Sequence, residues 1–154
     1  MVTKQVIRAA TGWLELGMPD DALEELAALT GADRSERRVL ELKLSAEMAK
    51  GDWRQASTTA LELCGQAADE PDFFLSAAYC LHEAGSTAEA RKCLLSGPEA
   101  LHDLPVFHYN MACYLWTLGD KDNATRHLNI AIGMDDSFLD SARVDRDLVG
   151  MVIG

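Results

Sequence analysis

The chain has 154 residues, of which 48% are apolar and 25% are charged, and its formal net charge is -11. This length suits a single domain, 1–154, with enough apolar content for a continuous core. The negative charge opposes binding to phosphate backbones and anionic membranes, since Ser35 and Glu36 interrupt the one basic run, Arg34 to Arg38. No stretch approaches the roughly 18 apolar residues of a membrane span, and the first residues lack the pattern of a signal peptide. We therefore expect a cytoplasmic protein with neither a nucleic-acid partner nor a membrane partner.

Apolar spacing, caps and helix breakers predict eight long helices and one short closing helix. In chain order, these helices are expected near 3–16, 19–30, 36–50, 53–67, 71–84, 87–96, 105–118, 121–134 and 137–143. Gly97-Pro98 ends the sixth helix, and the longer connection at 99–103 has room for a single helical turn.

Residues at the helix starts support these boundaries. Asp52 and Asp120 can cap the helices that follow them, and Ser86-Thr87-Ala88-Glu89 has the spacing of a reciprocal capping box. Prolines suit the first position of a helix, and three of them fall there: Pro19, Pro71 and Pro105.

A glycine followed five residues later by an alanine recurs with a period of 34 residues. The pairs are Gly17/Ala22, Gly51/Ala56, Gly85/Ala90 and Gly119/Ala124. A fixed period of this size indicates a repeat protein whose units bury their apolar faces against their neighbours. The glycine permits a sharp reversal after the first helix, and the alanine permits close packing of the second. The sequence therefore predicts four helical hairpins, near 3–36, 37–70, 71–104 and 105–138, with a C-terminal cap at 139–154.

This pattern resembles the tetratricopeptide repeat (TPR) family. The fourth unit matches best, through Asn110, Ala112 and the turn Gly119-Asp120, and Ala124, Leu128 and Ala131 continue the match. The second unit departs from the family pattern at Lys43, Leu44 and Glu47, which indicates a rotated first helix or a register shifted by one residue. The resemblance implies an all-α, right-handed α-solenoid of four antiparallel helical hairpins with a short capping helix.

The closing segment carries a second resemblance. Residues 141–148, Ser-Ala-Arg-Val-Asp-Arg-Asp-Leu, are similar to segments that terminate some bacterial TPR arrays. Such a cap covers the apolar end that a repeat stack would otherwise expose. The stretch that follows, 148–154, is unusually apolar, and it either folds back on the cap or docks on another chain.

The residues that most often carry chemistry form no recognised motif. Cys64, Cys80, Cys93 and Cys113 lack metal-ligand spacing and fall among apolar helical residues, so we expect reduced core thiols. The four histidines form no metal motif, and neither a phosphate-binding glycine loop nor a nucleophile elbow is present. We therefore expect no enzyme, catalytic residue, metal or cofactor; a Cys113–His82 pair assembled in space is the arrangement left open.

In the family's geometry, the first helices of the units line a concave groove that binds partners. The resemblance implies a groove with a basic end and an aromatic end, lined by Arg8, Arg38, Leu42, Met48, Leu75, Tyr79, His82, Tyr109, Asn110, Cys113 and Trp116. Such a surface suits a peptide or short helix of a partner protein. The alternative interpretation is that the aromatic side chains only fill space between adjacent helices. Recognition of a chaperone tail is disfavoured, because the expected Asn and Lys are replaced by Thr11, Ser45 and Cys113.

Three functions remain, in falling order. The first is an adaptor that binds a partner's peptide segment, the second is a secretion-type chaperone for a partner subunit, and the third is a self-assembling module that dimerises through its apolar tail or an end of the stack.

Overall fold

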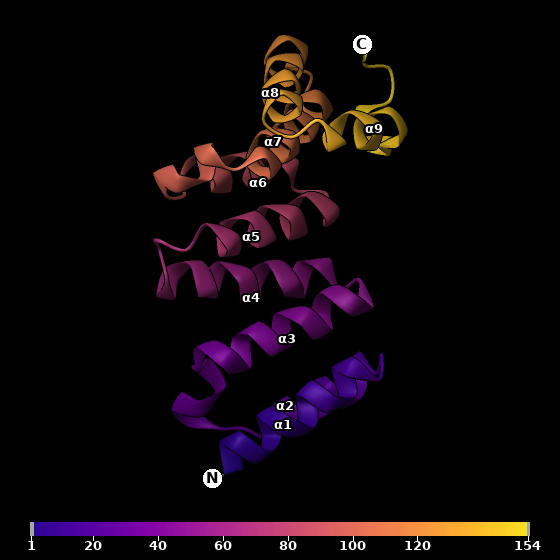
Figure 1. Cartoon of the computed structure of the whole chain (residues 1–154). Coiled ribbons are helices and arrows are strands. Elements are labelled where there is room, and N and C mark those ends of the chain that lie inside the picture. The colour runs from indigo at the N-terminus through magenta and orange to yellow at the C-terminus, as the bar shows by residue number, and fades with distance from the viewer. Residues whose placement is uncertain (1, 154) are drawn as a thin grey trace.

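All regular structure in the computed structural model, which describes residues 2–153, is helical (Figure 1). The α-helices are α1 (Val2–Glu15), α2 (Pro19–Ala27), α3 (Arg37–Lys50), α4 (Trp53–Gln66), α5 (Pro71–Glu83), α6 (Thr87–Leu95), α7 (Pro105–Thr117), α8 (Lys121–Met134) and α9 (Ser137–Val144). Three short 3-10 turns accompany them: η1 (Gly31–Ser35), η2 (Glu99–Asp103) and η3 (Arg146–Leu148). The predicted all-α class is confirmed, and every predicted helix is present with ends within three residues of those expected.

The four repeating glycines adopt one backbone conformation. Their φ angles are 71°, 73°, 88° and 90° at Gly17, Gly51, Gly85 and Gly119, in the left-handed region that residues with a Cβ rarely adopt. Each lies one or two residues after the end of one helix and two residues before the start of the next. The chain therefore reverses in the same way at each of these turns.

Two of the three predicted side-chain caps form. The Asp52 and Asp120 carboxylates accept hydrogen bonds from the backbone N–H groups of Gln55 and Asn123. Ser86 makes no side-chain cap hydrogen bond, so the prediction of a capping box there is wrong. The backbone angles at Ser86, φ -102° and ψ 56°, differ by up to about 20° from those at Asp52 and Asp120, whose side chains do form caps.

Each helix from α1 to α7 packs against the next helix along the chain, while α1 also contacts α3 and α5 contacts α7. Figure 1 shows the resulting layers, with α1 and α2 at one end and α7, α8 and α9 at the other. The repeating alanines, Ala22, Ala56, Ala90 and Ala124, are fully buried at these contacts. Close helix packing at the predicted small residues is thus observed.

The core consists of two clusters. The larger extends from α3 to η3, and the smaller joins α1, α2 and one side of α3. Helix α3 serves both, since Leu40 and Leu44 face the larger cluster while Val39, Leu42 and Ala46 face the smaller. The four cysteines are buried with free thiols, as predicted. Among residues 2–153, no helix has both the length and the apolar character needed to cross a bilayer.

Candidate functional site

The predicted basic end of the groove is exposed, with one exception. Arg8 on α1 and Arg38 on α3 are exposed, and Arg38 pairs with Glu41 at 3.6 Å. Leu42, however, is only 4% exposed and packs in the smaller cluster, so its predicted place in an open groove needs correction. The reason is that α3 packs on both α2 and α4, and the side of α3 that carries Leu42 faces α1 and α2.

The middle of the predicted groove lies on α3 and α5. Met48 and Leu75 are half-buried against the larger cluster. Tyr79 is 40% exposed and contacts Trp53 edge-on, with ring centroids 5.6 Å apart. Tyr79 thus presents an aromatic surface to solvent, held in place by a second ring.

The predicted aromatic end is covered. Tyr109 and Cys113 on α7 are buried, Trp116 and Asn110 are half-buried on the same helix, and His82 approaches from α5. The expectation that Tyr109 and Cys113 face an open groove is therefore corrected. The cover is the chain's own segment 145–153, called the tail below, which folds back onto α7 and α5.

The first anchor of the tail is Asp145. One of its carboxylate oxygens accepts a 2.6 Å hydrogen bond from the Tyr109 hydroxyl. The other accepts the backbone N–H of Asp147 at 2.9 Å, which starts the 3-10 turn η3. Phe138 stacks on the Tyr109 ring, with centroids 4.8 Å apart. A single carboxylate therefore both bends the tail and attaches it to α7.

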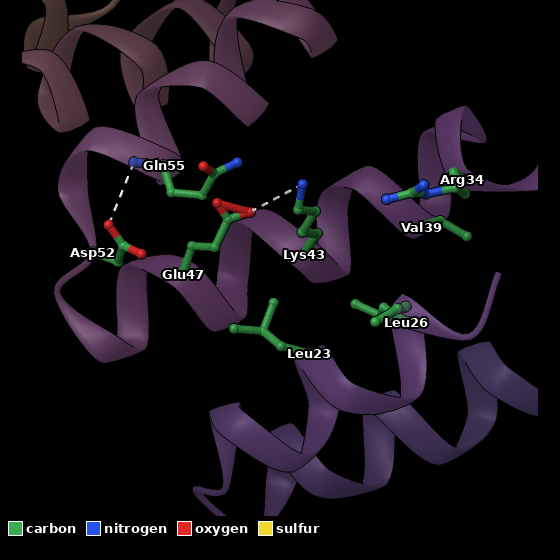
Figure 2. A pocket seen from close by; sticks show the side chains of 9 residues that line it. Leu23, Leu26, Arg34, Val39, Lys43, Glu47, Asp52 and Gln55 are labelled. Atoms are coloured by element: carbon green, nitrogen blue, oxygen red, sulfur yellow. Dashed lines mark hydrogen bonds and ion pairs between the residues drawn. The ribbon is translucent and has the colours of Figure 1, made fainter. Parts of the chain in front are cut away.

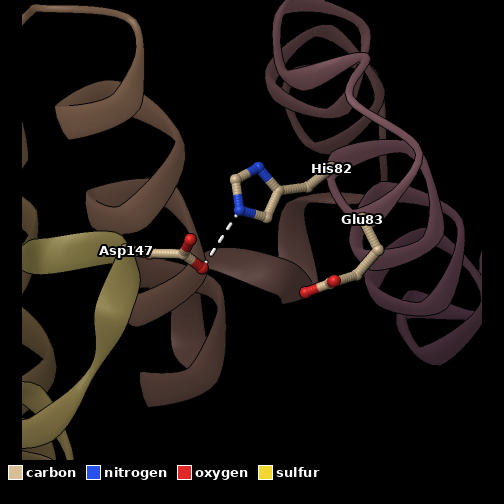
Figure 3. A group of neighbouring side chains, drawn as sticks. All are labelled: His82, Glu83 and Asp147. Carbon is tan, nitrogen blue, oxygen red and sulfur yellow. Dashed lines mark hydrogen bonds and ion pairs between the residues drawn. The ribbon is translucent and has the colours of Figure 1, made fainter.

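The second anchor joins the tail to α5. An Asp147 oxygen lies 3.0 Å from Nε2 of His82. Figure 3 shows the two side chains facing one another. The Nδ1 atom of the same ring lies 2.9 Å from the Thr87 hydroxyl, which fixes its orientation. Beside this pair, the exposed Arg146 guanidinium donates to both oxygens of Glu83, the shorter contact being 2.8 Å. The two acidic residues of the tail, Asp145 and Asp147, thus meet a hydroxyl and an imidazole, and the basic Arg146 between them meets a carboxylate.

The third anchor is a main-chain contact. Trp116 Nε1 donates to the Val149 carbonyl at 3.1 Å, and the Lys121 ammonium lies over the indole ring, 4.7 Å from its centroid. Leu148 is buried, and Met151 and Ile153 pack half-buried on the larger cluster. The hydrogen bond from Trp116 to a main-chain carbonyl does not depend on which side chain that residue carries. It would therefore hold any segment of suitable shape.

The electrostatics of this site favour neutral groups on α7. Burial, reinforced by the nearby Asp145 carboxylate, raises the pKa of both the Tyr109 hydroxyl and the Cys113 thiol. A neutral, buried thiol is poorly suited to nucleophilic attack. The sequence left open a Cys113–His82 pair. In the structure Cys113 Sγ faces Asp145 at 4.0 Å, whereas His82 faces Asp147 and Thr87, so each of the two side chains contacts other groups instead.

Two sets of side chains here could supply metal ligands. His82, Glu83 and Asp147 place one ligand atom each within 4.8 Å of one another, and so do Cys113, Asp145 and Asp147. The carboxylates of both sets already pair with protein donors, namely Tyr109, the His82 ring and Arg146. Both clusters are therefore explained by the hydrogen bonds and the ion pair that attach the tail to α5 and α7.

A second concavity lies between α2 and the α3–α4 pair. Its volume is about 280 Å³, and Leu23, Leu26 and Val39 form its apolar side (Figure 2). At its polar end Glu47 is 1% exposed and accepts a hydrogen bond from the Thr59 hydroxyl at 2.8 Å. Lys43 is 4.0 Å away, and burial raises the pKa of the Glu47 carboxyl.

Sequence reasoning identified the receiving side of the tail site but missed the residues that fill it. Asp145, Arg146 and Asp147 were visible as a closing motif, yet Tyr109 and His82 lie 36 and 65 residues before their aspartate partners. No spacing rule connects residues so far apart.

No family model matches the sequence, and no curated protein matches it.

Proposed function

We propose that the chain is a protein–protein interaction module, a cytoplasmic adaptor that binds a segment of a partner protein on the face formed by α1, α3, α5 and α7. In this proposal the helices form a TPR-like, right-handed solenoid of four hairpins with α9 as its cap. The 34-residue period, the repeated left-handed glycines and the buried alanines support this arrangement.

The observation that carries the proposal is that this face already holds a stretch of the chain, made of the 3-10 turn η3 and the irregular residues that follow it. Side chains of α5 and α7 contact the tail through a hydroxyl, an imidazole and an indole N–H, and the indole N–H donates to a main-chain carbonyl. Rigid aromatic side chains lose little entropy on contact and dominate many interfaces. The same groups can hold a stretch of another protein.

The rest of the face offers further contact area. Tyr79, Arg38 and Arg8 are exposed on α5, α3 and α1 respectively. One exposed aromatic side chain and two exposed guanidinium groups on these helices suit a partner that carries apolar and acidic residues. In this role the chain performs no reaction and needs no cofactor.

A self-assembling module is the second candidate. Val144, Val149 and Val152 are exposed on and beside the tail, and Val152 is 92% exposed. Exposed apolar side chains favour association with another apolar surface. A second copy of the chain could supply that surface.

Site-specific photocrosslinking in cells separates the two candidates. A photoreactive phenylalanine analogue replaces Tyr79 on the proposed face, and Leu61 on α4, which is 45% exposed, is the matched control position. We expect a crosslinked partner protein from position 79 and none from position 61. Equal crosslinking at both positions, or none at position 79, would overturn the proposal, and a crosslink to a second copy of the chain would favour self-assembly.

A further inference from the structure

We propose that the tail is a removable internal occupant, and that the partner segment which displaces it has an acidic, basic, acidic and aliphatic residue in that order. This inference rests on the proposed function and names the partner's chemistry at the α5–α7 end of the face. The tail itself, Asp145-Arg146-Asp147-Leu148, is the pattern for such a segment.

The contacts of the tail define what each position of the partner must supply. The first carboxylate must accept from the Tyr109 hydroxyl and from its own chain two residues later, as Asp145 does. The second carboxylate must reach His82 Nε2, as Asp147 does. A basic residue between them meets Glu83. These requirements follow from groups on α5 and α7, which remain in place when the tail leaves.

The aliphatic position supplies the apolar contact. Leu148 is 2% exposed within the larger cluster, and Met151 and Ile153 add partial burial after it. A partner segment without an aliphatic side chain here would leave this part of the core open to water. Burial of the aliphatic residue therefore selects among segments that carry the same charges.

The attachment of the tail is suited to exchange. The basic contact is at the surface, since the Arg146 side chain is 77% exposed, and exposed ion pairs contribute little to stability. The remaining anchors are two carboxylates, one main-chain hydrogen bond and the buried Leu148 side chain. A competing segment can reproduce every one of them, while the tethered tail competes at a high effective concentration.

Binding of a synthetic peptide tests the inference. The peptide has the sequence of residues 144–153 with a fluorescent label, and its binding to full-length protein is measured by anisotropy. In the wild-type protein the tail occupies the site. The apparent affinity for the peptide is then the intrinsic affinity multiplied by the fraction of molecules in which the tail is displaced. The variant Asp145→Asn/Asp147→Asn weakens the tail but leaves the receiving face unchanged.

We expect the peptide to bind this variant at least about tenfold more tightly than the wild type. The matched control is Asp136→Asn/Asp140→Asn, which removes the same charge from exposed positions outside the site and should bind like the wild type. A peptide with asparagine at both acidic positions should bind none of the proteins. Faster amide exchange at 147–151 in the weakened variant is expected in parallel.

Equal binding to wild type and weakened variant, no binding to either, or unchanged amide exchange would each overturn the inference. These outcomes are distinct from failure of the proposed function. A crosslinked partner at position 79 without peptide binding would leave an adaptor whose tail is a permanent cover. Peptide binding without a crosslinked partner would leave an exchangeable tail and remove the adaptor role.

Discussion

The first layer of the molecule, α1 to α3, and the last, α7 to η3, solve the same packing problem differently. The first has a small separate cluster and a cavity of about 280 Å³ beside a buried carboxylate. In the last, α7 is buried along most of its length, and the tail covers the side that α8 leaves open. The two ends of the molecule thus differ in what covers them, with a cavity at one end and the chain's own tail at the other.

Truncation of a buried leucine in each layer should give the largest contrast. Leu128→Ala on α8 is expected to cost about 3 to 4 kcal/mol of unfolding free energy, because it opens a new cavity in the larger cluster. Leu26→Ala on α2 should cost about 2 kcal/mol, since Leu26 already borders a cavity with an exposed rim. Urea denaturation measures both values. Equal costs would mean that the two layers are packed equally well.

Acid should destabilise the last layer through His127. Burial, together with the neighbouring His108 charge, lowers the pKa of His127 to about 4. Its Nδ1 lies 3.1 Å from Nδ1 of His108, and Arg126 and His102 add positive charge nearby. The unfolded chain then binds this proton more readily than the folded one. The contribution of His127 is therefore complete above about pH 6.5 and is lost as the pH falls toward 4.

Because the His127 ring is partly exposed, we expect this loss to be about 1 to 2 kcal/mol. Denaturation curves at a series of pH values should show the full loss in the wild type and a slightly smaller loss in His102→Gln, which removes one of the neighbouring charges. His127→Gln should flatten this part of the profile. An unchanged profile in His127→Gln would show that the stacked pair with His108 is not the source.

The first layer should respond to pH in the opposite direction. The pKa of Glu47 is raised by burial, so its contribution to stability is present below about pH 4.5 and is lost as the pH rises through the raised value. Glu47→Gln keeps an acceptor for the Thr59 hydroxyl and removes the buried charge. We expect a gain of about 1 kcal/mol at neutral pH that disappears in acid. A loss at neutral pH would show that the ion pair with Lys43 outweighs the cost of burial.

The smallest effect is expected at the main-chain anchor of the tail. Trp116→Phe keeps an aromatic ring beneath the Lys121 ammonium but removes the N–H that donates to Val149. Loss of one partly exposed hydrogen bond should cost about 0.5 to 1 kcal/mol. Amide exchange at 149–153 should accelerate while exchange in α1 to α3 stays the same. Acceleration in both layers would mean that the tail stabilises the whole stack.

The sequence predicts well what depends on near neighbours. Helix bounds followed from prolines, glycine turns and aspartate caps, because each acts within a few residues. Ser86 shows the limit of such rules, since its spacing suits a cap but its side chain forms none. The burial of Leu42 depends on how α3 packs on α2 and α4, and the tail site depends on Asp145 and Asp147 meeting side chains of distant helices. Contacts of that range follow from the packing of several elements together.

The path of the last residues has a practical consequence for handling the protein. Met151 and Ile153, close to the C-terminal end of the sequence, pack against the core. An affinity tag fused at this end would add charge and bulk to the segment whose seating is to be measured, and would bias every peptide titration. Val2 at the start of α1 is 65% exposed. Tags, dyes and surface tethers therefore belong at the first residue, where they leave the binding equilibrium undisturbed.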